Sequence, residues 1–149
     1  MELHSVNVAQ ILAHKGRDIH TIRPSANVYE ALEAMARHKV GALLVMEGDD
    51  LVGIFSERDY ARKVALHGHN ARDALISEMM SAQVCTTHEQ AELPSVMNAM
   101  TDGHFRHLPV LREGKVVGMI TIGDVVKAVI EAQQSTISQL SGYIQGNLA

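Results

Sequence analysis

The octapeptides VGIFSERD (Val52–Asp59) and VGMITIGD (Val117–Asp124) are two versions of one pattern. Outward from them, residues 18–64 align with residues 83–129 at one constant offset and without a gap. A constant offset over most of a chain indicates an internal duplication. The sequence therefore predicts two copies of one structural unit.

The hydrophobic pattern within each copy predicts its secondary structure. In the first copy a short extended piece precedes Val28, Leu32 and Met35, which recur at helical spacing. Two short apolar runs, residues 42–46 and 51–55, flank a turn and read as a hairpin. A helix follows the hairpin, and the second copy repeats every feature. We expect an α+β fold in which each copy runs β-α-β-β-α.

The chain beyond the second copy has a different pattern. We divide it into repeat 1 (8–66), a linker (67–82), repeat 2 (83–130) and a C-terminal helical extension (131–149). Apolar residues in the last part follow alternating steps of four and three, a heptad-like seam with one polar member. Its positions are Val126, Ile130, Gln133, Ile137, Leu140 and Ile144. The seam could pack within the chain or across a homodimer, and we favour the dimer.

Composition excludes several classes of function. Hydrophobic residues make up 46% of the 149 residues, enough for a buried core. The formal net charge of −4 gives no basic surface for nucleic acid, and only 3% of residues are aromatic. No apolar run approaches the ~20 residues that cross a bilayer. With a single cysteine, Cys85, and no secretory signal pattern, we expect a cytoplasmic protein that binds neither nucleic acid nor membrane.

Each octapeptide ends in a hydroxyl residue followed three positions later by a carboxylate: Ser56 with Asp59, and Thr121 with Asp124. The simplest interpretation is a capping box, in which the two side chains satisfy backbone N–H groups at a helix start. The functional interpretation is a ligand site, where the helix N-terminus meets a phosphate and the carboxylate accepts the hydroxyls of a ribose. One pair of residues can serve both purposes.

The duplication, the two octapeptides and the segment Phe105–Val110 (FRHLPV) together resemble tandem CBS domains, also called a Bateman module. The resemblance covers nearly the whole chain, and the tail beginning at Glu131 is similar to small bacterial proteins that contain only the CBS pair. It implies two repeats packed sheet to sheet with pseudo-twofold symmetry. It also implies two clefts that take AMP, ADP, ATP, NAD(H) or S-adenosylmethionine as ligand.

By the same resemblance, each cleft draws on both repeats. The first would use Asp59 for ribose, Ser56 near phosphate and Ile54 beside the base, with Cys85 and Phe105 as a wall. The residues of the second would be Asp124, Thr121 and Met119, with His20, Val40, Gly41 and Ala42 across from them.

The two clefts should differ in charge. Arg106 and His107 precede a strand at positions that face phosphate in related modules, whereas their counterparts in the first copy are Gly41 and Ala42. Charge-assisted hydrogen bonds are stronger than neutral ones, so the Asp124 cleft should prefer phosphate-rich ligands. Arg58 could partly compensate in the first cleft. A solvent-exposed strand-end charge is the plain alternative for Arg106.

The function that follows is a regulatory module whose nucleotide occupancy is transmitted to a protein partner that the sequence does not identify. One alternative is a structural dimerisation scaffold with vestigial clefts. A less favoured alternative is a nucleotide-acting enzyme, for which His107 is the only candidate base. We expect no enzyme activity and no catalytic cofactor. We also expect no metal, because neither dense group of histidines has zinc-ligand spacing.

Overall fold

The computed structural model describes residues 6–148, with side chains to residue 142. The chain divides into two compact units, each described here by itself. The repeat-1 unit comprises Asp18–Val84 and Glu113–Val117, and the repeat-2 unit comprises Met1–Arg17, Cys85–Arg112 and Gly118–Ala149. Among the described residues, no helix is both long enough and apolar enough to span a membrane.

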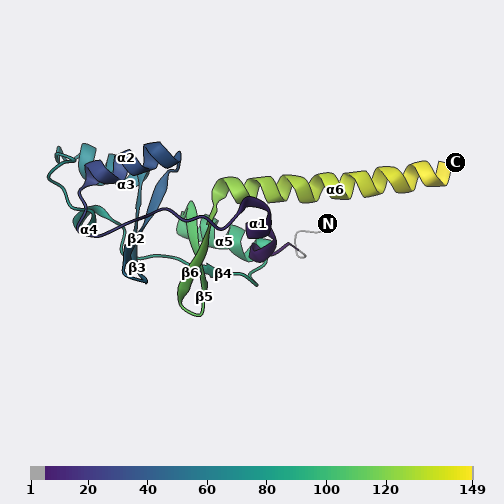
Figure 1. Cartoon of the computed structure of the whole chain (residues 1–149). Coiled ribbons are helices and arrows are strands. Elements are labelled where there is room, and N and C mark those ends of the chain that lie inside the picture. The colour runs from purple at the N-terminus through teal and green to yellow at the C-terminus, as the bar shows by residue number, and fades with distance from the viewer. Residues whose placement is uncertain (1–5, 149) are drawn as a thin grey trace. The chain divides into compact units, whose positions relative to one another are not determined.

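A three-stranded sheet in the order β1-β2-β3 forms the centre of the repeat-1 unit (Figure 1). Strand β1 (Thr21–Ile22) runs parallel to β2 (Ala42–Glu47), and β2 pairs antiparallel with β3 (Asp50–Ser56). Helix α2 (Val28–His38) connects β1 to β2, which gives the parallel pair its crossover. The predicted hairpin is confirmed, with a bulge between Val45 and Met46.

The helix after this hairpin differs from the expected regular helix. It begins as α3 (Glu57–Asp59) and continues as a π-helical segment, Tyr60–Ala65. The wider ring is visible in the hydrogen bond from the backbone N–H of Leu66 to the carbonyl oxygen of Ala61, five residues earlier. A short helix, α4 (Ile76–Met79), then lies within the stretch that the sequence suggests as a linker.

The second repeat has the same order of elements as the first. Strand β4 (Thr87–His88) is parallel to β5 (His107–Arg112), and β6 (Lys115–Thr121) completes a sheet in the order β4-β5-β6. Helix α5 (Leu93–Gly103) connects β4 to β5, and α6 (Ile122–Leu148) follows β6. The predicted α+β fold with β-α-β-β-α copies is thereby confirmed, while sheet-to-sheet packing remains a prediction.

Equivalent residues end the crossover helices of the two units. The C-cap residue is Lys39 for α2 and His104 for α5, and both adopt the left-handed conformation, with φ of 55° and 57°. At the other end, the Asn27 side chain accepts a hydrogen bond from the backbone N–H of Glu30, whereas Pro94 lies in the first turn of α5. The duplication therefore preserves the helix lengths, although the residues at the helix starts differ.

The core of the repeat-1 unit forms where α2, α4 and the π-helical segment cover the sheet. Phe55 is its largest fully buried side chain, and Val28, Leu43, Val64 and Ile76 are also fully or almost fully buried. These residues come from five different segments, so the apolar stripe of α2 predicted from its spacing packs as expected.

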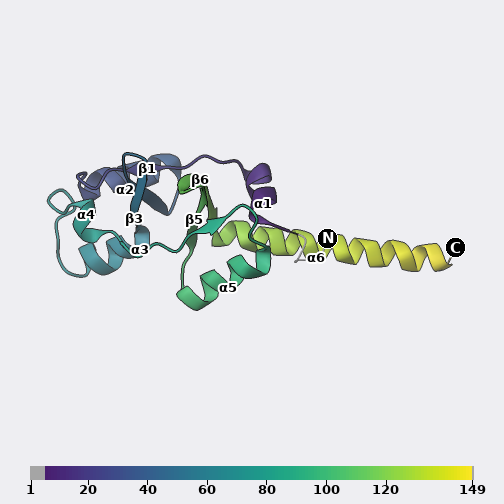
Figure 2. The same ribbon diagram turned by 90° about the horizontal axis from the view of Figure 1, so that it is seen from below.

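The helix that comes before each β-α-β-β-α copy packs in the unit of the other copy. Helix α1 (Val8–Lys15) lies in the repeat-2 unit, where the backbone N–H of Val8 donates to the carbonyl oxygen of Ala91. Helix α4 lies in the repeat-1 unit, where the N–H of Ile76 donates to the carbonyl oxygen of Ala26. The two repeats therefore exchange their first helices (Figure 2).

These exchanged helices explain why both octapeptides contain glycine at the same position. A Cβ at Gly118 would lie 2.8 and 2.9 Å from the two δ carbons of Leu12 on α1. One at Gly53 would lie 2.5 Å from the Sδ of Met80, directly after α4, and 3.0 Å from the carbonyl oxygen of Ser81. Both positions are buried strand residues with room only for a hydrogen atom.

Helix α6 is continuous through the predicted extension, so residues 131–148 are not a separate element. Its 27 residues make it about 40 Å long. The predicted seam is uncovered: the side chains of Val126, Ile130, Ile137 and Leu140 are 48–63% exposed. Ile144, the last seam position, lies outside the described side chains. Among the described side chains, the seam of α6 therefore does not pack within the repeat-2 unit.

Candidate functional site

The Ser56–Asp59 pair forms a complete capping box at the start of α3. The Oδ2 of Asp59 accepts from the Ser56 backbone N–H and the Ser56 Oγ, each at 3.0 Å. The Ser56 Oγ in turn accepts from the Asp59 backbone N–H at 3.2 Å. The capping interpretation of this pair is confirmed, because each side chain satisfies a backbone donor of the other residue.

Asp59 also has partners that the sequence pattern does not predict. Its Oδ1 accepts from the Ser81 Oγ at 2.9 Å and lies 3.2 Å from the Nζ of Lys63. Lys63 itself donates to the carbonyl oxygen of Met80 and to Ser81. Asp59 is only 8% exposed, so both of its carboxylate oxygens are engaged in a nearly closed site.

The Thr121–Asp124 pair repeats the capping geometry at the start of α6. The Oδ2 of Asp124 accepts from the Thr121 backbone N–H at 2.8 Å and from the Thr121 Oγ1 at 3.0 Å. The Thr121 Oγ1 accepts from the Asp124 backbone N–H at 3.3 Å. At both helix starts the duplicated sequence therefore produces the same local structure.

The surroundings of Asp124 differ from those of Asp59. Lys15, at the end of α1, donates to the Asp124 Oδ2 at 2.6 Å and to the carbonyl oxygen of Met119 at 2.9 Å. No hydrogen bond from residues 6–142 reaches the other carboxylate oxygen, Oδ1, and 20% of the side chain is exposed. This carboxylate can therefore accept hydrogen bonds from a ligand without losing its present partners.

Arg106 lies directly beside the start of α6. Its backbone carbonyl accepts from the N–H of Ile122 at 2.9 Å, just as the carbonyl of Gly41 accepts from the N–H of Glu57 at 3.0 Å. Arg106 is exposed, and His107, which begins β5, is half-buried. The repeat-2 unit thus brings a guanidinium-bearing residue to the helix N-terminus where repeat 1 has glycine.

The remaining predicted residues of the repeat-2 unit are apolar or nearly so. Phe105 is half-buried and its ring lies over Gly103, where a Cβ would come within 2.2 Å of it. Met119 is half-buried on β6. Cys85 is a half-buried free thiol.

In the repeat-1 unit, the predicted residues gather around the first strand pair. His20 accepts a backbone hydrogen bond from Leu44, and its ring stacks on His38 with centroids 4.1 Å apart. Desolvation is the largest cause that lowers the pKa of His38, and charge repulsion from His20 and Arg37 lowers it further. The other positions lie at a helix end and a strand start: Val40 and Gly41 are half-buried, and Ala42 is buried. Ile54 and Arg58 are half-buried too.

Each unit contains the residues of one half of each predicted cleft, and both the clefts and the facing of their halves remain predictions. Sequence reasoning missed Lys15, Lys63 and Ser81, which contact the two aspartates. Lys63 could have been noticed, because it lies four residues after Asp59 on a predicted helix. No sequence signal marks Lys15 or Ser81, since both lie outside the aligned repeats.

The most strongly paired acid in the described chain is a residue that the sequence did not single out. Glu89 is 7% exposed and accepts from Arg112 at 2.6 Å and from Arg17 at 2.7 Å. The pKa of Glu89 is lowered from its ordinary 4.5 to about 2. The hydrogen bond from Arg112 is the largest cause, and the hydrogen bond from Arg17 is the second. This cluster ties the segment after α1 to β5 and has a structural role.

No group of three His, Cys, Asp or Glu residues in the described part of the chain is arranged to hold a metal ion. The two local groups of histidines therefore have no third ligand within the described residues. His67 and His69 have ring centroids 6.4 Å apart in a loop.

Comparison with known proteins gives a consistent family assignment. The family model of the CBS domain matches residues 8–66 and 76–131. A mitochondrial CBS domain-containing protein of Arabidopsis thaliana, CBSX3, is 36% identical over 124 residues. The match covers 80% of this chain and 60% of the plant protein, so the chain spans well under two thirds of that relative.

Solved structures agree with the sequence comparison. A candidate signal-transduction protein with CBS domains from Burkholderia ambifaria is 44% identical, with a TM-score of 0.82. The match covers 86% of this chain and 96% of that structure. A hexameric CBS-CP12 protein from bloom-forming cyanobacteria is 25% identical with a TM-score of 0.74, over 81% of this chain and 66% of that one.

Proposed function

Because this chain belongs to the CBS-domain family, we propose that it is a regulatory module that binds an adenosine nucleotide and signals its occupancy to a partner protein. The similar protein from Burkholderia ambifaria is named for signal transduction, which supports a module without enzyme activity of its own. The lone cysteine supports a cytoplasmic setting.

The observation that carries this proposal is the open carboxylate of Asp124. Its Oδ1 has no hydrogen-bond donor among residues 6–142, while its Oδ2 is fixed by the helix start and by Lys15. A fixed carboxylate with one open oxygen is suited to accept a ribose hydroxyl. Fixing the acceptor in advance lowers the entropy lost when the ligand binds.

Positive groups beside Asp124 support a phosphate-bearing ligand. The Lys15 ammonium group lies 2.6 Å from the carboxylate, and Arg106 is held beside the first residue of α6. The dipole of α6 adds a favourable field for an anion at its N-terminus. We therefore expect ligands with more phosphates to bind this half-site more tightly.

The test is a titration of refolded, ligand-free protein with AMP, ADP, ATP, NAD and NADH, followed by thermal melts and calorimetry. A ligand present at 100 times its dissociation constant should add about 2.7 kcal/mol. For a domain of this size the midpoint should rise by roughly 5 to 10 °C. The shift should vanish in Asp124→Ala and persist in Asp102→Ala, an exposed aspartate of α5 that serves as the matched control.

Two other results would select the alternatives. Flat melts with every nucleotide would overturn ligand binding and favour the dimerisation scaffold with vestigial clefts. Product formation from ATP or NAD that disappears in His107→Ala would instead establish a nucleotide-acting enzyme. A shift that survives Asp124→Ala but is lost in Asp59→Ala would move the site to the other repeat.

The exposed seam of α6 supports self-association, in which a second copy of the chain covers the seam. The helix carries exposed apolar side chains at heptad-like spacing, and residues 132–149 contain no Asp, Glu, Lys or Arg. A solvent-exposed helix of this length normally carries charges on its free face. The cyanobacterial relative is a hexamer, so this kind of protein does assemble. We expect a homodimer.

The dimer can be tested by light scattering after gel filtration. Ile137→Glu places a charge in the seam, and the protein should then elute as a monomer with unchanged circular dichroism. Gln134→Glu introduces the same charge at a position outside the seam and should leave the dimer intact. A dimer in both variants would exclude the seam as the interface.

A further inference from the structure

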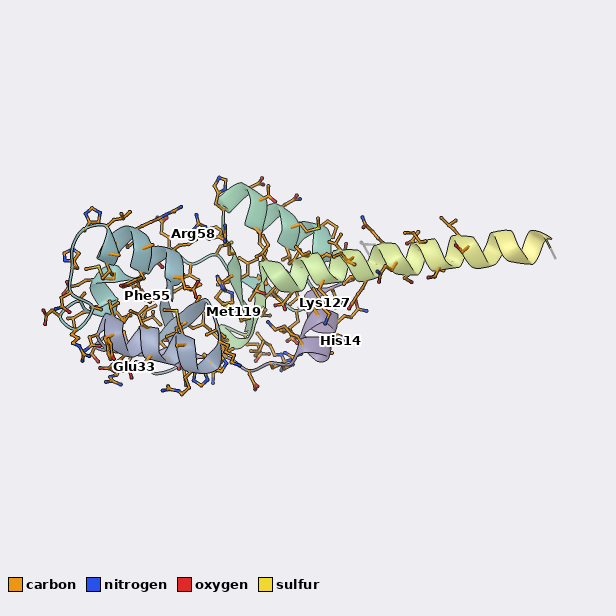
Figure 3. The ribbon with its side chains drawn as sticks, turned by 90° about the horizontal axis from the view of Figure 1, so that it is seen from above. His14, Glu33, Phe55, Arg58, Met119 and Lys127 are labelled. Carbon is orange, nitrogen blue, oxygen red and sulfur yellow. The ribbon has the colours of Figure 1, made fainter. Side chains whose placement is uncertain are left out.

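A pocket of about 340 Å³ lies between α1 and the first half of α6, within the repeat-2 unit. Figure 3 shows His14 of α1 and Lys127 of α6, two residues of its lining. Of the residues assigned to nucleotide binding, only Asp124 lines it. Its volume is near the lower end of the range of small-molecule sites, about 300–1,000 Å³. The pocket therefore shares Asp124 with the proposed nucleotide site, and its other lining residues form a second place at which a small ligand could be held.

The inner surface of the pocket is apolar. Val6 and Ile11 are each 8% exposed and Ala132 is 5% exposed. Ala128, one turn before Ala132 on α6, is half-buried. An apolar surface of this kind gains free energy when it is covered by an aliphatic or aromatic group. It therefore suits a ligand with an apolar body.

The polar groups at the mouth have opposite charges. Lys127 and Glu131 both line the pocket, both are exposed, and they lie one turn apart on α6. Neither forms an ion pair with any residue of the described chain, 6–142, whereas Lys15 is already held by Asp124. Residues four apart on a helix have Cβ atoms about 5–6 Å apart. One small ligand can therefore contact both charged groups at once.

These charges disfavour simpler ligands. A plain carboxylate would be attracted by Lys127 but repelled by Glu131, and a plain amine would meet the reverse arrangement. A molecule that carries an ammonium group and a carboxylate group on the same carbon atom satisfies both side chains. An α-amino acid has this arrangement, with its side chain free to extend onto an apolar surface.

We propose that the pocket between α1 and α6 binds a free α-amino acid with a large apolar side chain. Its carboxylate pairs with Lys127, its ammonium group pairs with Glu131, and its side chain covers Val6, Ile11 and Ala132. The groups that bind the amino acid are not among those assigned to the proposed nucleotide site. The two are adjacent through Lys15, which lines the pocket and holds Asp124, so occupancy of one can affect the other.

The experiment uses the full-length protein without nucleotide, observed by ¹H–¹⁵N correlation spectra during titration with L-leucine. Amide shifts should concentrate on α1 and on α6 around residues 127–132. Two analogues separate the charges: 4-methylpentanoate lacks the ammonium group and 3-methylbutylamine lacks the carboxylate. Each should bind about tenfold more weakly than leucine, because each leaves one charged side chain without a partner.

Matched substitutions locate the site. Lys127→Gln and Glu131→Gln should each weaken leucine binding by about tenfold, and Ala128→Leu should block it by filling the pocket. Lys115→Gln and Glu113→Gln, at the exposed turn of the second hairpin, should have no effect. Unchanged melting temperatures will show that the variants are folded.

Several results would overturn this proposal. They are the absence of shifts with leucine, equal binding of leucine and 4-methylpentanoate, and full binding in both charge variants. Because nucleotide is absent, these outcomes do not depend on the proposed function. A failed nucleotide titration, conversely, leaves the leucine result standing.

Discussion

The two helix starts, Ser56–Asp59 and Thr121–Asp124, have the same cap but different surroundings. In repeat 1, Ser81 and Lys63 occupy the second carboxylate oxygen of Asp59. In repeat 2, Lys15 binds the oxygen that the cap already uses, and the second oxygen accepts no hydrogen bond from residues 6–142. The cap is local and was duplicated with the sequence, whereas availability to a ligand depends on neighbouring residues that differ between the two copies.

The positions of those neighbours explain the difference. When the offset between the copies is extended past the aligned residues, Gly16 corresponds to Ser81 and Met80 corresponds to Lys15. Within the aligned residues, Ala128 corresponds to Lys63. Each residue that contacts one aspartate therefore has a counterpart that cannot make the same contact. The duplicated motif has diverged into one closed site and one open site through three substitutions at its periphery.

The largest expected effect concerns the closed site. Asp59→Ala removes the acceptor for the Ser56 backbone N–H, the Ser81 hydroxyl and Lys63 in a nearly buried place. The free energy of unfolding should fall by about 2–3 kcal/mol. Asp124→Ala removes a more exposed cap and should cost about 1 kcal/mol. Urea titration measures both, and equal losses would contradict the distinction between the two sites.

The next effect tests the exchanged helices. Gly118→Ala forces its Cβ against Leu12 of α1 and should destabilise the protein by about 1–3 kcal/mol. Gly53→Ala meets the flexible side chain of Met80 and should therefore cost less than Gly118→Ala. Gly123→Ala, where the nearest atom is 3.7 Å away, is the control and should not destabilise. Thermal unfolding of the three variants checks the order.

A third prediction concerns acid, because only repeat 2 has the Glu89 cluster; the equivalent residue of repeat 1 is Pro24. The pKa of Glu89 is lowered to about 2 in the folded protein, from an ordinary 4.5. Its contribution to stability is therefore complete above pH 4.5 and is lost as the pH falls toward 2.

Urea titrations between pH 5 and 2 measure this dependence. Glu89→Gln should flatten the pH dependence in that window, while Glu113→Gln, an exposed control, should keep the wild-type slope. An unchanged slope in Glu89→Gln would show that the two arginines do not hold this carboxylate in solution.

The smallest expected effect comes from Lys15. The side chains of Lys15 and Asp124 are 31% and 20% exposed, so this ion pair is partly screened by water. Lys15→Met should lower the free energy of unfolding by less than about 1 kcal/mol. A loss as large as that of Asp59→Ala would mean that Lys15 closes its site as firmly as Ser81 closes the other.

Much of the fold followed from the sequence because its signals are simple to read. The constant offset between the copies is visible without any structure, and the helical spacing of Val28, Leu32 and Met35 and the hydroxyl–carboxylate pairs each act over a few residues. The sequence could not show that Lys15 reaches Asp124, because they are 109 positions apart and only tertiary packing joins them. The π-helical turn after Asp59 has no counterpart in the equivalent helix, so the repeat pattern hides it as well.

The exchange of first helices has a consequence for the order in which a growing chain can fold. Helix α1 is synthesised before both repeats, yet its partner Ala91 is made 83 residues after Val8, because the two positions are far apart in the chain. The repeat-1 unit contains α4, so most of its parts are available once Met80 has left the ribosome. Until β5 follows, Val8, Ile11 and Leu12 have no core to enter. Such long-range contacts slow folding. During translation the apolar face of α1 is exposed to solvent, and we expect a chaperone to bind there.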